Sequence, residues 1–280
     1  MSATRSFTDK LQGSQDDTRS LLCVGLDPDP ARLPDVLSGS MSLRDRVFTF
    51  CCDILEATRD HACAYKLNFA FFEALGADGW NVLERLVSVI PDSKIKIADA
   101  KRGDIGNTGR FYAESILQAL NFDACTVSPY MGRSSVEPFL QYRGKMAFVL
   151  ARTSNPDARE IQEWSQAGVP LYRHVARSAV SWGRDLDGEV GLVVGATDPA
   201  GLARLRNDCP STCFLVPGIG SQGGDVSRVL AAGLTADGQL IINSSRSILY
   251  ADSGADYAAA AERAARDLRD EIERNRPPNA

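Results

Sequence analysis

The feature that most constrains this chain is a regular alternation of short apolar runs with longer amphipathic stretches. The runs have the length and apolar character of buried strands, whereas the stretches between them repeat with a helical period. Alternation at this spacing indicates parallel βαβ units. Eight strands are predicted, at residues 21–26, 64–69, 95–100, 124–128, 146–151, 190–194, 214–217 and 240–243.

Eight such units close a (β/α)8 barrel, and 280 residues is a typical length for one. A doubly wound open sheet is the alternative, because periodicity alone does not show closure. The first strand is followed by GLDPDP (Gly25–Pro30) and not by GxGxxG, so the dinucleotide-binding fingerprint is absent. Helices are predicted at residues 43–58, 71–90, 111–120, 134–141, 157–182, 199–206, 225–232 and 256–274.

No shift in composition or linker divides the chain, so we expect one domain over residues 1–280. Its polar ends, at about residues 1–18 and 274–280, are expected to be unstructured extensions.

Composition excludes several classes of protein. Lys and Arg number 31 and Asp and Glu 36, a net charge of −5, so no overall field attracts nucleic acid or an anionic membrane. No apolar run reaches the roughly 18 residues of a membrane span, and the N-terminus lacks a signal-peptide core. The odd count of seven cysteines, no CxxC and only two histidines argue against a disulfide framework or a zinc site. We therefore expect a cytoplasmic enzyme or binding protein with structural thiols.

Charged residues interrupt the apolar strands at the ends where barrel enzymes carry their catalytic groups. The first strand ends in Asp27, and the second contains Lys66. The period of two along residues 95–101 points Asp99 and Lys101 inward together. These side chains are expected to converge at one mouth of the barrel.

Each charge also has a structural interpretation. Asp27 precedes a proline and suits a turn or helix cap, Lys66 could extend out of the barrel end, and Asp99 with Lys101 could form a structural ion pair. Burying several charges together is costly unless they compensate one another. Their convergence therefore favours an array that performs chemistry.

A second half-site follows the last two predicted strands. Residues 217–225 (PGIGSQGGD) form a glycine-rich loop that opens a helix, and residues 243–247 (NSSRS) follow the eighth strand. Loops at these two positions of a barrel often bind phosphate through backbone N–H groups, and Arg246 would add a bidentate partner. The alternative is a pair of flexible turns with a surface arginine.

Together these motifs strongly resemble orotidine 5′-phosphate decarboxylases, in particular the longer, bacterial branch of that family. The resemblance covers about residues 20–252, and its most specific part is the DxKxxDI element. The matching segments are GLDPDP (Gly25–Pro30), KLNFAFFE (Lys66–Glu73), DAKRGDIGNT (Asp99–Thr108), SPYMGRSS (Ser128–Ser135), ARTSNP (Ala151–Pro156), PGIGSQGGD (Pro217–Asp225) and SSRSI (Ser244–Ile248).

The resemblance implies conversion of orotidine 5′-monophosphate to UMP and CO2, the last step of de novo UMP synthesis. It further implies a cofactor-free and metal-free (β/α)8 barrel that acts as a homodimer with shared active sites. In these terms Asp27 binds a ribose hydroxyl, and Lys66 holds the ribose and positions Asp99. Asp99 lies against the substrate carboxylate, and Lys101 donates the proton to C6.

The resemblance assigns the remaining contacts to three parts of the substrate site. Asp104, Ile105 and Thr108 reach into the partner's site, Ser135 contacts the pyrimidine edge with Pro217 near the base, and Gln222, Ser245 and Arg246 hold the phosphate. The chain departs from the family pattern at Ser128, where asparagine is common in this branch, and at Ser245, where shorter relatives have glycine.

Two other functions remain open at this point. A metal-dependent phosphosugar lyase or aldolase on a related barrel can share a DxK element, and it would need a carboxylate-rich Mg²⁺ site. A non-catalytic sensor of phosphorylated ligands would have no use for Lys101 between two aspartates.

Overall fold

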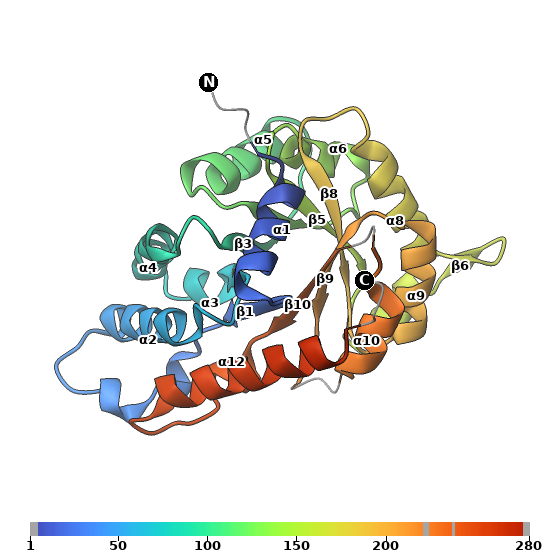
Figure 1. The fold of residues 1–280 in the computed structure, drawn as a ribbon. Coiled ribbons are helices and arrows are strands. Elements are labelled where there is room, and N and C mark those ends of the chain that lie inside the picture. Colours follow the sequence, from blue (N-terminus) through green and yellow to red (C-terminus); the bar gives the residue numbers. More distant parts are fainter. Residues whose placement is uncertain (1–4, 221–223, 237–238, 277–280) are drawn as a thin grey trace.

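The computed structural model describes residues 5–220, 224–236 and 239–276 of the chain. Within them, parallel strands pair in the order β1-β10-β9-β8-β5-β4-β3-β2 and close into a barrel (Figure 1). Every predicted strand is present, with ends within two residues of the expected ones. The barrel strands are β1 (Leu22–Leu26), β2 (Ala64–Asn68), β3 (Ile95–Arg102), β4 (Ala124–Val127), β5 (Met146–Arg152), β8 (Glu189–Val194), β9 (Cys213–Pro217) and β10 (Leu240–Ser244).

Direct pairing of the first strand with the last confirms the (β/α)8 barrel over the open sheet. Leu22 of β1 stands opposite Ile242 of β10 in parallel register, so the sheet has no free edge. Helices cover the outside of the barrel (Figure 1). They are α2 (Leu43–Thr58), α3 (Phe69–Glu73), α4 (Ala77–Val89), α5 (Gly106–Ala113), α6 (Arg133–Val136), α7 (Ala158–Gln162), α8 (Leu171–Trp182), α9 (Pro199–Asp208), α10 (Val226–Gly233), α11 (Arg246–Leu249) and α12 (Tyr257–Arg274).

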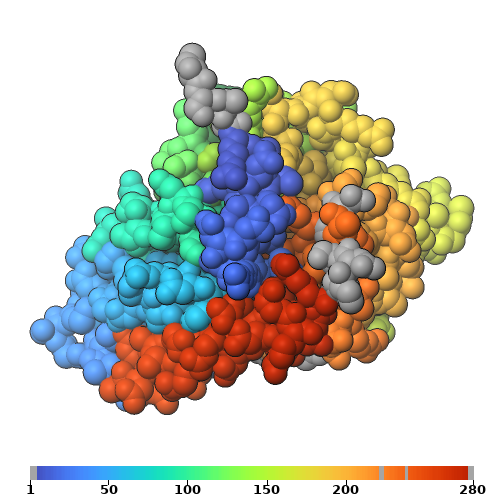
Figure 2. Space-filling model, in the orientation of Figure 1, coloured from blue at the N-terminus to red at the C-terminus, as the bar shows by residue number. Residues whose placement is uncertain are grey.

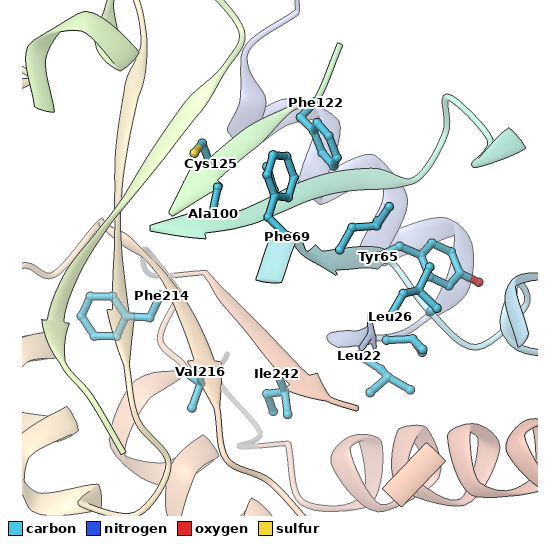
Figure 3. Packing of buried hydrophobic residues seen from close by; sticks show 14 of the residues in the cluster. Leu22, Leu26, Tyr65, Phe69, Ala100, Phe122, Cys125, Phe214, Val216 and Ile242 are labelled. Carbon is cyan, nitrogen blue, oxygen red and sulfur yellow. The ribbon is translucent and has the colours of Figure 1, made fainter. Parts of the chain in front are cut away.

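Alternate strand residues build two apolar layers, which is why the strands read as nearly continuous apolar runs. Outward-facing side chains such as Leu22, Phe214 and Ile242 pack beneath the helices (Figure 3). Inward-facing side chains such as Ile95 and Ile97 fill the barrel. The charged side chains Lys66, Asp99 and Lys101 lie beyond this inner apolar layer, toward the C-terminal ends of β2 and β3.

The N-terminal segment was expected to be unstructured, and this expectation is wrong. It contains the helix α1 (Phe7–Thr18), whose first turn is capped by the Ser6 hydroxyl accepting from the Asp9 N–H. Phe7 and Leu11 are fully buried in the inner apolar layer. Only these two residues of the helix are large and apolar, so its amphipathic pattern is weak in the sequence.

Polar contacts place α1 across the N-terminal end of the barrel. Lys10 pairs with Asp123, Ser14 donates to the carbonyl of Cys63, and Gln15 donates to the carbonyl of Leu240, all at starts of strands. Figure 2 shows the helix lying over this face. The helix thus covers the N-terminal end of the barrel, which leaves the C-terminal end as the expected side for a site.

Two long predicted helices are interrupted. The helix expected at 71–90 is divided into α3 and α4 at Gly76, whose φ of +62° is left-handed. The helix expected at 157–182 is divided into α7 and α8 by a hairpin of β6 (Ser165–Gln166) and β7 (Val169–Pro170). Ala167 and Gly168 both have left-handed backbones, as a tight two-residue hairpin turn requires.

All seven cysteines are free, and six of them are buried. Burial raises the pKa of Cys63 to about 12. The six buried cysteines therefore behave as the small apolar core residues that the sequence predicts. None of the helices in the described ranges is both long and apolar enough to cross a membrane.

Candidate active site

A cavity of about 600 Å³ opens at the C-terminal end of the barrel. This is the end at which the loops of barrel enzymes carry their chemistry. The structure brings together seven of the predicted site residues in its lining: Asp27, Lys66, Asp99, Lys101, Pro217, Ser245 and Arg246.

Four of these side chains form the charge array, which we define as Asp27, Lys66, Asp99 and Lys101. Lys66 Nζ lies 2.9 Å from Asp99 Oδ2 and 3.7 Å from Asp27 Oδ1. Lys101 Nζ lies 2.6 Å from the other oxygen of Asp99, Oδ1. Positive and negative groups thus alternate along the array, as the sequence predicts.

Burial differs sharply along the array. The side chains of Lys66 and Asp99 are 5% and 12% exposed, whereas that of Lys101 is 53% exposed. The ion pair of Lys66 with Asp99 is therefore the fixed part, and the Lys101 ammonium is the part that a ligand can reach.

Mutual compensation keeps the buried groups charged. Burial alone would raise the pKa of Asp99, but the ammonium groups of Lys66 and Lys101 outweigh it and hold that pKa well below its usual value. Burial would likewise lower the pKa of Lys66, but the carboxylates of Asp27 and Asp99 raise it above its usual value. Asp99 and Lys66 therefore stay ionised around neutral pH.

The backbone departs from regular β geometry at Lys101. Its φ of +46° is left-handed, and the register between β3 and β4 shifts between Ala98 and Arg102. A left-handed backbone at a residue other than glycine costs about 1–3 kcal/mol and is concentrated at functional sites. Lys101 still reaches Asp99, although the alternation predicted along residues 95–101 is broken.

The residues of the predicted phosphate grip line the same cavity. Pro217 is the last residue of β9, Gly218 and Ile219 follow it, and Ser245 and Arg246 follow β10. Gly218 has a φ of +105°, which explains a glycine at that position. Gln222, the other residue predicted to hold the phosphate, lies outside the described residues.

Polar residues to which the sequence assigns no individual role also line the cavity. Thr126 of β4 lines the cavity, as do Ser154 and Asn155 after β5. Asn243 of β10 also lines it, and its buried Oδ1 has no hydrogen-bond partner among the described residues. Uncharged polar side chains at strand ends are common in any barrel, so their presence in the sequence does not by itself indicate a site. A search of the polar residues at every strand end would have included them.

Ser135 does not line the cavity. It is fully buried at the end of α6, where its hydroxyl donates to the carbonyl of Gly132 at 2.8 Å. Ser154, by contrast, lies in the wall formed with the apolar side chains of Leu150 and Val193. The serine that borders the cavity beside these apolar side chains is therefore Ser154, in the loop after β5.

Asp104, Ile105 and Thr108 also lie outside the cavity of their own chain. Asp104 accepts the backbone N–H of Ile105, and the Ile105 side chain is 56% exposed. Thr108 borders a separate groove beside the exposed rings of Phe111 and Tyr112.

A resident metal would need a cluster of donor side chains. In the part of the chain that the structure describes, no group of three or more His, Cys, Asp or Glu residues is arranged to hold one. This observation does not favour the metal-dependent lyase or aldolase.

Comparison with known proteins agrees with this geometry. Residues 20–264 match the sequence profile described as "Orotidine 5'-phosphate decarboxylase / HUMPS family". Curated relatives named orotidine 5′-phosphate decarboxylase include one from Roseiflexus castenholzii, 50% identical over 95% of this chain and 97% of its own. Another, from Variovorax paradoxus, is 44% identical over 97% of this chain and 100% of its own.

Solved structures give the same result. The Leishmania donovani OMP decarboxylase has a TM-score of 0.82 and 40% identity, covering 97% of this chain and 98% of that one. The Leishmania donovani UMP synthase has a TM-score of 0.85 and 42% identity, and the match covers 98% of this chain and 57% of that one. The profile match, the curated relatives and the shared barrel lead to one conclusion: the chain belongs to the orotidine 5′-phosphate decarboxylase family.

Proposed function

We propose that this protein decarboxylates orotidine 5′-monophosphate to UMP and CO2 without a cofactor, as a carbon–carbon lyase. The observation that carries the proposal is the charge array, in which Asp99 is held between two ammonium groups at the mouth of a barrel. An apolar wall and Arg246 border the same cavity. A nucleotide with a carboxylate on its base presents groups complementary to each of these parts.

Binding begins at the phosphate. Arg246 and the backbone after β9 line the same cavity as the array, and charge-assisted hydrogen bonds from an arginine suit a phosphate dianion. The pyrimidine would pack against Leu215 and Pro217, and Asp27 would accept a ribose hydroxyl. The buried Asp27 Oδ1 has no hydrogen-bond partner among the described residues, so it is an acceptor available for that hydroxyl.

The chemical step uses the charge array. The bond between C6 and the carboxylate breaks, CO2 leaves, and the electron pair stays on C6. The ammonium of Lys101 stabilises this negative charge and then transfers a proton to C6. Lys101 is left neutral and regains a proton from solvent.

Asp99 has two roles in this scheme. Its negative charge orients the Lys101 ammonium, and it would repel the substrate carboxylate until CO2 departs. Lys66 keeps Asp99 ionised and in place. Binding energy from the phosphate end would offset the cost of bringing two carboxylates together.

The proposed enzyme is a homodimer in which Asp104, Ile105 and Thr108 complete the partner's site. In support, these residues follow the array directly in sequence but lie outside the cavity of their own chain. Exposed apolar side chains nearby, Ile105 and Phe111 at 56% and 53% exposure, suit burial against a second copy.

Purified protein incubated with orotidine 5′-monophosphate and EDTA tests the function. We expect loss of substrate absorbance matched by formation of UMP, with no dependence on added metal. Activity that EDTA abolishes would favour the metal-dependent lyase or aldolase. Binding of nucleotides without turnover of any of them would favour the sensor.

A further inference from the structure

Thr126 is buried, at 2% exposure, at the point where β3 and β4 lose their regular pairing. Cys125 stands opposite Ala98, and Val127 stands opposite Arg102. Three residues of β3, Asp99–Lys101, therefore face Thr126 as the single intervening residue of β4. The bulge in the strand that carries the array is centred on this threonine.

The Thr126 hydroxyl makes two hydrogen bonds, both to the array. Its oxygen accepts the backbone N–H of Lys101 at 3.0 Å. The hydroxyl itself donates to Asp99 Oδ1 at 3.0 Å, and this is the oxygen that also accepts from Lys101 Nζ. One side chain thus contacts both the backbone of Lys101 and the carboxylate that its ammonium approaches.

We propose that Thr126 is a positioning residue that holds Lys101 in its left-handed conformation and Asp99 in the orientation needed for proton transfer. This inference rests on the proposed decarboxylase function. The physical need is clear from the bulge, because an N–H that leaves the strand ladder must find another acceptor or remain unsatisfied. Only a side chain that both donates and accepts can serve the N–H and the carboxylate together.

The ion pair of Lys101 with Asp99 would not supply this restraint alone. The Lys101 side chain is half exposed, and a flexible lysine stem allows its ammonium to occupy several positions around one carboxylate oxygen. Hydrogen bonds from Thr126 to the Lys101 backbone and to Asp99 Oδ1 reduce the number of positions that the Lys101 ammonium can occupy. A shift of about 1 Å in a catalytic group can reduce the rate on the order of a hundredfold.

The test compares Thr126→Val, which keeps the shape but removes the hydroxyl, with Thr126→Ser, which restores it. The matched control is Thr58→Val, because Thr58 is also buried but donates to the carbonyl of Ile54 within α2. We expect Thr126→Val to lower kcat by about ten- to a hundredfold with KM changed by less than about threefold. Thr126→Ser should recover most of kcat, and Thr58→Val should leave kcat unchanged.

A second measurement does not depend on activity. Hydrogen exchange of the Lys101 amide should be faster in Thr126→Val than in wild type and close to wild type in Thr126→Ser. If the valine variant does not fold, Thr126→Ala takes its place in both measurements. An unchanged exchange rate, or a kcat loss no larger than that of Thr58→Val, would overturn the proposal. A wild-type protein that does not decarboxylate the nucleotide refutes the proposed function instead. The exchange rate of the Lys101 amide then still shows whether Thr126 holds the Lys101 backbone.

Discussion

At the scale of single residues, the site depends on charges that the fold keeps ionised. Asp99 is nearly buried but lies between two ammonium groups, and Lys66 is nearly buried but lies between two carboxylates. Neither group would remain charged alone in this environment. The array is therefore one unit, and removing a member changes the electrostatics of the others.

The lowered pKa of Asp99 makes stability depend on pH in a defined direction. In the unfolded chain the pKa of Asp is about 3.9. At pH 3 the Asp99 carboxylate therefore binds a proton in the unfolded state but not in the folded state. The contribution of Asp99 is thus present above the unfolded-state pKa and is lost as pH falls toward the folded-state pKa. Lys66, whose pKa is raised, contributes below about 10.4 and loses its contribution only in strong alkali.

We therefore expect the free energy of unfolding of Asp99→Asn to fall less steeply than that of wild type between pH 6 and pH 3. Urea denaturation at the two pH values measures this difference. Equal losses in the two proteins would mean that Asp99 is not held in its charged form by the fold.

The left-handed backbone of Lys101 predicts an unusual result for two substitutions. Alanine at this position keeps the strain, whereas glycine removes it at the cost of greater freedom in the unfolded chain. Lys101→Gly should have a free energy of unfolding higher than Lys101→Ala by up to about 1 kcal/mol, with both inactive. Thermal or chemical denaturation compares them, and a more stable alanine variant would contradict the strain.

At the scale of elements, the loops after β9 and β10 are proposed to bind the phosphate of the substrate, the end remote from the chemistry. Arg246→Ala should lower kcat/KM for the nucleotide about ten- to a hundredfold, as expected for losing a charge-assisted bond to phosphate. It should leave the phosphate-free nucleoside almost unaffected, because that substrate never makes the contact. Steady-state kinetics of Arg246→Ala and wild type with the nucleotide and with the nucleoside measures both values of kcat/KM. Equal losses would assign Arg246 a structural role.

The sequence predicts the strands well and the helices less well, for a physical reason. Strands buried on both faces are apolar throughout, so they stand out from their surroundings. Helix patterns continue through single residues whose backbone breaks them, such as Gly76 and the turn at Ala167. The helix α1 was missed because its burial depends on Phe7 and Leu11 alone.

The cost of burying a charge also decides which site residues can be predicted from the sequence. The sequence predicts Asp27, Lys66 and Asp99, because a charge inside an apolar strand or directly after one is costly to bury without a partner. The sequence does not single out Thr126, and it assigns Asn243 no role of its own within residues 243–247, because an uncharged polar residue near a strand end costs little to bury. The contact expected for Ser135 depended on resemblance alone, and the structure buries that residue outside the cavity.

At the scale of the whole molecule, the proposed shared site makes activity a property of the dimer. Lys101→Ala and Asp104→Ala homodimers should both be defective at every site. In a mixed dimer, one site receives both defects and the other contains only intact residues. Random reassembly of equal amounts makes about half of the dimers mixed, with half of their sites intact.

Co-refolding the two mutants should therefore restore roughly a quarter of wild-type activity per site. Separately refolded mutants, combined afterwards, serve as the control. Mixed dimers that assemble but recover no activity would mean that Asp104 acts within its own chain.

In the proposed enzyme, the ammonium of Lys101 stabilises the charge on C6 and donates the proton at every site of the dimer. The most direct measurement is single-turnover decarboxylation of orotidine 5′-monophosphate by Lys101→Ala, with UMP binding and thermal unfolding measured on the same preparation. We expect the rate to be reduced by at least about a thousandfold, in a protein that still folds and binds UMP. A folded Lys101→Ala protein that decarboxylates the nucleotide at close to the wild-type rate would contradict it.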